Sequence, residues 1–142
     1  MPRELASFRG RRSVRFSSLD GGFSTGYLLH TSIVAWLDFY GNCVVSSGSD
    51  GSIVKFNYID GRVEYVIQEG SPIKSQRISN GILVIGTMTE VKVYSFSSGV
   101  FIRRLIAAYM INKVEIVDSK IVVGFYLDGS YQVSVFDFEA CK

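Results

Sequence analysis

The chain has 142 residues, of which 47% are hydrophobic and 20% are charged, and its 15 basic and 13 acidic residues leave a formal net charge of +2. This composition excludes a disordered chain and is sufficient for one globular core. Phe and Tyr are frequent, with 10 and 8 residues, and so are Val, Ile, Ser, Thr and Gly. Such a mixture favours strands joined by tight turns, so we expect an all-β fold.

Cysteine and histidine are too sparse to build a metal site. Cys43 and Cys141 are far apart and belong to no CxxC motif, and His30 is the single histidine. We therefore expect no metal, no cofactor and no disulfide framework. No uncharged run is apolar enough to span a bilayer, and the N-terminus has no secretory apolar region. These features predict a cytoplasmic or nuclear protein without a membrane partner.

The first segment, residues 4–29, predicts three short strands at 4–8, 12–18 and 23–29. A basic cluster surrounds the first turn and consists of Arg9, Arg11, Arg12 and Arg15. Three interpretations of this cluster stay open: a basic turn on a strand edge, a nucleic-acid patch that contacts phosphates, or part of a mitochondrial targeting signal.

The second segment, residues 32–68, repeats the pattern of the first. LASFRGRRSVRF aligns without a gap on VSSGSDGSIVKF at an offset of 40, which places Phe16 on Phe56. The Asp-Gly turns at 20–21 and 60–61 have the same offset. Four strands are predicted here, at 32–38, 43–48, 52–58 and 62–68.

Two further segments, residues 72–106 and 112–138, continue the pattern. The predicted strands are 72–78, 81–87, 90–96 and 100–106, followed by 112–118, 120–126 and 131–138. The stretch FIRRLIAAYMINK also has a helical stripe, formed by Ile102, Leu105, Ile106, Tyr109 and Met110. The repeat register favours a strand followed by a loop there.

One aromatic position recurs in all four segments: Phe16, Phe56, Tyr94 and Phe136, spaced by 40, 38 and 42 residues. We expect these side chains to be buried. Four antiparallel strands in roughly 40 residues is the period of a β-propeller blade. The chain then holds about 3.5 blades, fewer than closed propellers have, so we predict an incomplete ring that another chain or segment completes.

The segment that begins at His30 resembles the WD-repeat family. His30 precedes the first strand, and SSGSDGSIVKFN places Asp50 in the turn and Phe56-Asn57 where the family has Trp-Asp. The resemblance implies a buried hydrogen-bond network to which His30 and Asp50 contribute. No segment contains Trp-Asp, and Thr89-Glu90 stand where the third segment should have the turn Asp-Gly.

Three functions from different classes are compatible with such a propeller. WD-repeat relatives serve as assembly or recruiting subunits, which implies a non-enzymatic protein-interaction scaffold. The Arg cluster supports an RNA or ribonucleoprotein-associated subunit instead. The repeated alternation of Asp-Gly turns and strands also resembles that of quinoprotein-like propellers, which are enzymes.

Catalytic residues are not evident. Asp50 and Asp128 each precede a Gly, which is explained by strand-connecting turns, and His30 is interpreted as a structural hydrogen-bonding group. The side chains expected to anchor a protein partner lie in loops on one rim: Tyr109, Met110 and Tyr126. The alternative is that these three side chains cap the core between blades.

Overall fold

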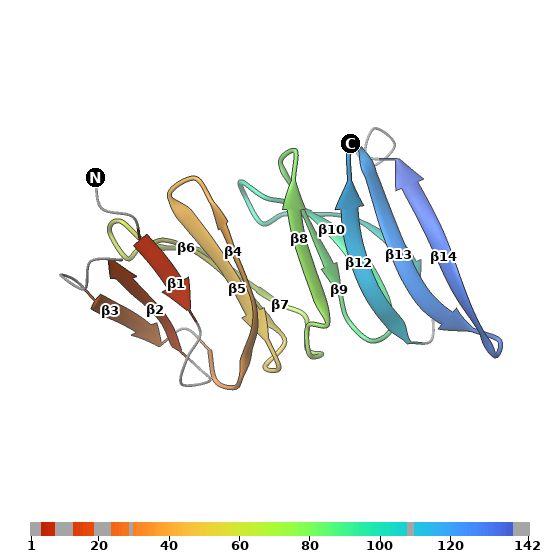
Figure 1. Ribbon diagram of the computed structural model, residues 1–142, viewed down its shortest axis with the longest axis horizontal. Helices are drawn as coiled ribbons and strands as arrows, with labels where there is room; N and C mark the ends of the chain where they lie inside the picture. The colour runs from red at the N-terminus through yellow and green to blue at the C-terminus, as the bar shows by residue number, and fades with distance from the viewer. Residues whose placement is uncertain (1–3, 8–12, 19–23, 29, 108–109, 138–142) are drawn as a thin grey trace. The chain divides into compact units, whose positions relative to one another are not determined.

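In the computed structural model, described residues are 4–7, 13–18, 24–28, 30–107 and 110–137, and side chains are described from residue 30 onward. These residues form fourteen strands, which Figure 1 shows in chain order from red to blue. Within them there is no helix long and apolar enough to cross a membrane.

The strands have the following bounds: β1 (Glu4–Ser7), β2 (Ser13–Ser18), β3 (Ser24–Leu28), β4 (Val34–Tyr40), β5 (Cys43–Gly48), β6 (Ser52–Asn57), β7 (Val63–Gln68), β8 (Ser75–Ser79), β9 (Ile82–Gly86), β10 (Glu90–Ser95), β11 (Phe101–Ala107), β12 (Ile111–Val117), β13 (Lys120–Leu127) and β14 (Ser130–Asp137). All fourteen were predicted from the sequence, and each observed bound lies within three residues of the predicted one.

Every strand pairs antiparallel with its neighbour in sequence. The sheets are β1-β2-β3, β4-β5-β6-β7, β8-β9-β10-β11 and β12-β13-β14. The helical alternative for residues 102–110 is wrong up to Ala107, because β11 is a strand that pairs with β10. Leu105 and Ile106 of this strand pack on the apolar core, so burial overrides the helical spacing.

The chain divides into two compact units, Met1–Gly70 and Ser71–Lys142. In the described residues the first unit contains sheets β1–β3 and β4–β7, and the second contains β8–β11 and β12–β14. That all four sheets belong to one ring segment stays a prediction.

Strand register gives the repeated aromatic residues equivalent positions. In three sheets a two-residue turn joins the first two strands, and the second residue after that turn is Val44, Leu83 or Ile121. These residues pair with the recurring aromatic residues Phe56, Tyr94 and Phe136 respectively. In the first sheet Phe16 pairs with Ala6, but its side chain lies outside the described residues.

The recurring aromatic side chains are buried where a sheet is complete. Phe56 is 0% exposed and Tyr94 is 6% exposed. Phe136 is half-buried and packs against the core of the second unit. The expectation of burial is therefore confirmed for Phe56 and Tyr94 and only partly for Phe136.

The core of the second unit lies between its two sheets. It consists of Ile82, Val84, Val91, Val93, Ile111, Val114, Ile121, Val123 and Phe125. Strand β12 contacts β8, β9 and β10, so the first strand of one sheet covers the face of the preceding sheet. In Figure 1 β12 is the strand drawn beside β8 and β9.

Candidate interaction site

The hairpin β13–β14 is longer than its counterpart β9–β10. Gly124 pairs with Val133 as Gly86 pairs with Val91, and three further residue pairs follow before the turn at Asp128. In β9–β10 only one residue pair follows Gly86 before the turn. This pair is Thr87 with Glu90, joined by the hydrogen bond from Thr87 N to Glu90 O. The additional length places Tyr126 opposite Tyr131 near the tip.

The turn at the tip accounts for one of the two aspartates considered as catalytic groups. Asp128 and Gly129 have φ angles of 52° and 79°, the left-handed region that a two-residue hairpin turn requires at both positions. Asp128 therefore lies in a strand-connecting turn, as predicted from its sequence context.

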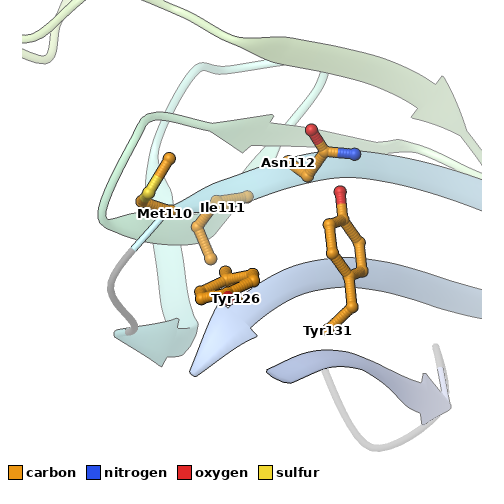
Figure 2. Close-up of a pocket in the computed structure, with 5 residues that line it drawn as sticks. All are labelled: Met110, Ile111, Asn112, Tyr126 and Tyr131. Atoms are coloured by element: carbon orange, nitrogen blue, oxygen red, sulfur yellow. The ribbon is translucent and has the colours of Figure 1, made fainter. Parts of the chain in front are cut away.

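An apolar cavity of about 250 Å³ lies at the base of this extension. It is lined by Met110, Ile111, Asn112, Tyr126 and Tyr131, which we call the tyrosine pocket. Figure 2 shows Tyr131 of β14 directed toward Asn112, and the ring of Tyr126 beneath Ile111. The structure thus brings together Met110 and Tyr126, two of the three predicted interaction residues, while Tyr109 lies outside the described residues.

The geometry of the tyrosine pocket is fixed by backbone and ring contacts. The rings of Tyr126 and Tyr131 are in an edge-to-face arrangement, with centroids 6.1 Å apart and planes at 84°. Tyr126 N donates to Met110 O at 3.1 Å, and Tyr126 Oη donates to Gly129 O at 3.1 Å. Met110 has a φ of 79°. These contacts hold three exposed apolar side chains around one concavity.

A second site surrounds His30, which is buried in the first unit. Its Nδ1 lies 3.1 Å from Asp50 Oδ2 and 2.9 Å from Ser52 Oγ, and its Nε2 lies 2.7 Å from Ser46 Oγ. Because an ionised carboxylate can only accept, Nδ1 carries the proton shared with Asp50. This cluster corresponds to the network that the WD-repeat resemblance implies.

Asp50 also organises the backbone around the turn. Its carboxylate accepts from Thr31 N at 3.0 Å and from Ser52 N at 3.1 Å. Burial acts to raise the pKa of Asp50, but these hydrogen bonds, the Ser52 hydroxyl and His30 outweigh it and leave the pKa below its ordinary value. All of its partners belong to the protein fold, so the arrangement is structural.

A third cluster contains the buried Lys55. Its Nζ lies 3.1 Å from Glu64 Oε1 and 5.6 Å from the centroid of the Tyr65 ring. The same carboxylate accepts from Cys43 Sγ at 3.5 Å. Burial, followed by the hydrogen bond to Glu64, raises the pKa of Cys43 and keeps the thiol protonated, which disfavours nucleophilic chemistry.

The Arg cluster falls almost entirely outside the described residues. Arg9, Arg11 and Arg12 are not described, and Arg15 is placed only by the backbone of β2, where it pairs with Ser7 and Gly26. Its nucleic-acid interpretation stays a prediction. Within the described part of the chain, no group of three or more His, Cys, Asp or Glu residues could hold a metal ion.

Several residues of these sites were missed in the sequence. Ser46 and Ser52 complete the His30 network, yet serine is too frequent in this chain for its position to be informative. In the third blade Thr87 Oγ1 accepts from Thr89 N and Glu90 N and replaces the expected turn aspartate. Tyr131 was assigned to a strand, and only the register places it in the pocket.

Comparisons with known proteins identify the fold. No protein-family profile matches the sequence, and a search of curated proteins found no relative. Among solved structures, the computationally designed Ika4 protein has a TM-score of 0.81 at 22% identity, over 94% of this chain and 86% of that chain. The computationally designed Ika8 protein has a TM-score of 0.71 at 22% identity, over 96% of this chain and 46% of that chain.

The structure of U3-55K is also similar, with a TM-score of 0.78 at 14% identity, over 98% of this chain and 46% of that chain. The chain therefore has a β-propeller fold with antiparallel sheets like propeller blades, as predicted. It spans about half the length of Ika8 and of U3-55K, which supports an incomplete ring that other segments complete.

Proposed function

We propose that this chain is a non-enzymatic protein-interaction scaffold, which serves as an assembly or recruiting subunit of a larger complex. The tyrosine pocket is the observation that carries the proposal. Exposed aromatic side chains and methionine offer a large contact area at interfaces, and a concavity of about 250 Å³ accommodates one large apolar side chain of a partner.

The extended hairpin supports the same proposal. A surface hairpin two residue pairs longer than its counterpart β9–β10 is not required for packing within the second unit, since the core residues of β13 end at Phe125. The additional residues instead hold the tyrosine pair outward. Variation of loops on a constant framework is how repeat folds acquire binding surfaces.

A displayed library of random peptides tests this proposal. We expect purified chain to enrich peptides with a large apolar residue, and Tyr131→Ala to weaken their binding by about tenfold or more, as for a central interface aromatic residue. Tyr40→Ala is the matched control, since Tyr40 is a similarly exposed strand tyrosine in the first unit. Binding would be measured by fluorescence anisotropy. Failure to enrich any peptide, or equal binding to both variants, would contradict the proposal.

The scaffold proposal includes a segment that pairs with residues 131–138, of which 138 lies outside the described residues. Strands β6 and β10 each pair on both sides, whereas β14 pairs only with β13 among the described strands. We expect the isolated chain to self-associate, because such an edge presents free backbone groups beside apolar side chains. Sedimentation and amide exchange measure this. A compact monomer with slow exchange throughout β14 would show that the edge is already covered.

A further inference from the structure

Another concavity lies on the sheet β8–β11, beside its last strand. It has a volume of about 550 Å³ and is lined by residues of β10 and by four consecutive residues of β11: Glu90, Lys92, Phe101, Ile102, Arg103 and Arg104. We call it the basic groove. Among the described strands β11 pairs with β10 alone, so the groove lies at a margin of the sheet.

Two β-bulges explain why consecutive residues of β11 line the same groove. Side chains of a regular strand alternate between the two faces of the sheet. The register between β10 and β11 skips Ile102 and Leu105, which are the extra residues of the two bulges. Because a bulge redirects side chains and increases the local twist, apolar and basic residues of β11 meet in one place. The same twist disfavours regular pairing of this edge with a further strand.

The first half of the basic groove is apolar and exposed. Phe101 is 51% exposed, and its ring makes an edge-to-face contact with Tyr94 at a centroid distance of 5.6 Å. Ile102 is also exposed, and Val100, directly before β11, is 62% exposed. Three successive apolar side chains are thus accessible next to two arginines. Such a contiguous apolar patch marks an interaction surface.

The second half of the groove is basic. Arg104 Nη1 donates to Glu90 Oε2 at 3.1 Å, and Lys92 Nζ lies 3.5 Å from Glu90 Oε1. The hydrogen bond from Arg104, reinforced by Lys92, holds the pKa of Glu90 below its ordinary value, so this carboxylate is ionised at neutral pH. The three cations of the groove therefore exceed its one carboxylate by two charges. The exposed guanidinium of Arg104 has further N–H donors with which to bind a second carboxylate.

The repeat shows that the fold does not require these charges. Lys92 lies two residues before Tyr94, the recurring aromatic residue of its sheet. The residues at the same place in the other sheets are uncharged: Val14, Val54 and Ser134. Arg104 pairs with Lys92 as Val66 pairs with Val54. Folding alone thus does not account for the basic residues of the groove.

We propose that the basic groove binds an extended acidic peptide, in which two neighbouring carboxylates contact Arg103 and Arg104 and an adjacent large apolar side chain packs on Phe101. The order of basic and apolar residues along β11 is complementary to this motif in charge and in polarity. The site lies on a different sheet from the tyrosine pocket, and the proposal is independent of that pocket.

A peptide fits the groove better than a nucleic acid does. Val100 and Ile102 have no aromatic ring on which a base stacks, whereas they suit the aliphatic side chains of a peptide. A nucleic-acid strand has a phosphate at every nucleotide and would bring negative charge beside Glu90. A peptide can place its carboxylates at the arginines alone.

Fluorescence anisotropy of a fluorescein-labelled peptide, SEEVFVS, tests the proposal on the full-length chain. We expect binding at about 50 mM salt that weakens as the salt rises to about 500 mM, because exposed charges are screened. Arg104→Gln should weaken binding by about tenfold or more. Lys120→Gln is the matched control and should have no effect, since Lys120 is an exposed base that pairs with Asp137 on another sheet.

The apolar half of the motif is tested separately. Phe101→Ala should weaken binding of SEEVFVS by about tenfold, as for an aromatic residue central to an interface. Circular dichroism verifies that each variant is folded, which the exposure of Phe101 and Arg104 favours. The charge-reversed peptide SKKVFVS should not bind the parent chain.

Four outcomes would overturn the proposal. Equal binding of SEEVFVS by the parent chain and by Arg104→Gln or Phe101→Ala, or no binding at millimolar peptide, would show that the groove does not receive this motif. Loss of SEEVFVS binding in Tyr131→Ala would assign the peptide to the tyrosine pocket. Binding of labelled oligouridylate that is tighter than that of SEEVFVS and is lost in Arg104→Gln would identify a nucleic-acid site.

Discussion

Replacing Phe56 by Ala is expected to lower the free energy of unfolding by about 3–5 kcal/mol, because it removes a large, completely buried side chain. Phe56 forms a cluster with Val44 and Val54, and Leu37 and Tyr58 pack against it. The cavity left behind can collapse only partly, since Phe56 lies in β6 and the strands on both sides of it, β5 and β7, are fixed by their pairing. Urea unfolding, followed by circular dichroism, measures the change.

Phe39→Ala is the matched control for this substitution. Phe39 lies in the same sheet and is exposed, with an edge-to-face contact to Tyr58 at 5.4 Å. Its removal should cost about 1 kcal/mol. Equal losses for the two variants would mean that Phe56 does not occupy a core position and that the repeat alignment based on it is wrong.

Asp50→Ala is expected to cost about 2–4 kcal/mol, since it leaves three donors, among them the buried His30, without their acceptor. The affected groups are Thr31 N, Ser52 N and His30 Nδ1. Asp60→Ala is the control, because the Asp60 carboxylate accepts from Arg62 N in an exposed turn. The loss for Asp60→Ala should be about 1 kcal/mol or less. Similar losses for both aspartates would contradict a buried network at His30.

The same network makes stability depend on pH. Because the pKa of Asp50 is lower in the folded chain than in the unfolded chain, its contribution is present above the ordinary aspartate value and is lost as the pH falls through the folded pKa. Denaturant midpoints measured from pH 7 to pH 2 should therefore converge for the parent chain and Asp50→Ala at the acidic end. A constant difference across this range would show that the carboxylate charge does not contribute.

The sequence predicted the strands well and the site residues less completely, for physical reasons. Strand positions follow from alternation and from turn residues, which are local properties, and the recurring Phe56 and Tyr94 supplied the register. Contacts such as Ser46 with His30 join different strands and depend on the three-dimensional path of the chain. Serine, unlike a recurring aromatic residue, gives no signal of such a contact.

The tyrosine pocket illustrates the same limit. Met110 and Tyr126 were predicted as interaction residues from their loop positions, but Tyr131 was assigned only to a strand. Its role depends on the two additional residue pairs in β13–β14, which place it opposite Tyr126. The unequal spacing of 38 and then 42 residues between Phe56, Tyr94 and Phe136 was the sequence signal of that extension.

The pairing of each strand with its neighbour in sequence also determines how this chain folds. Among the described strands, every pairing joins neighbours in sequence, so hairpins can form over short loops and the entropy of loop closure is small. Folding is then expected to proceed sheet by sheet. In the second unit β8–β11 would form a template on which β12–β14 condenses, and β14 would be the first strand to exchange its amide protons.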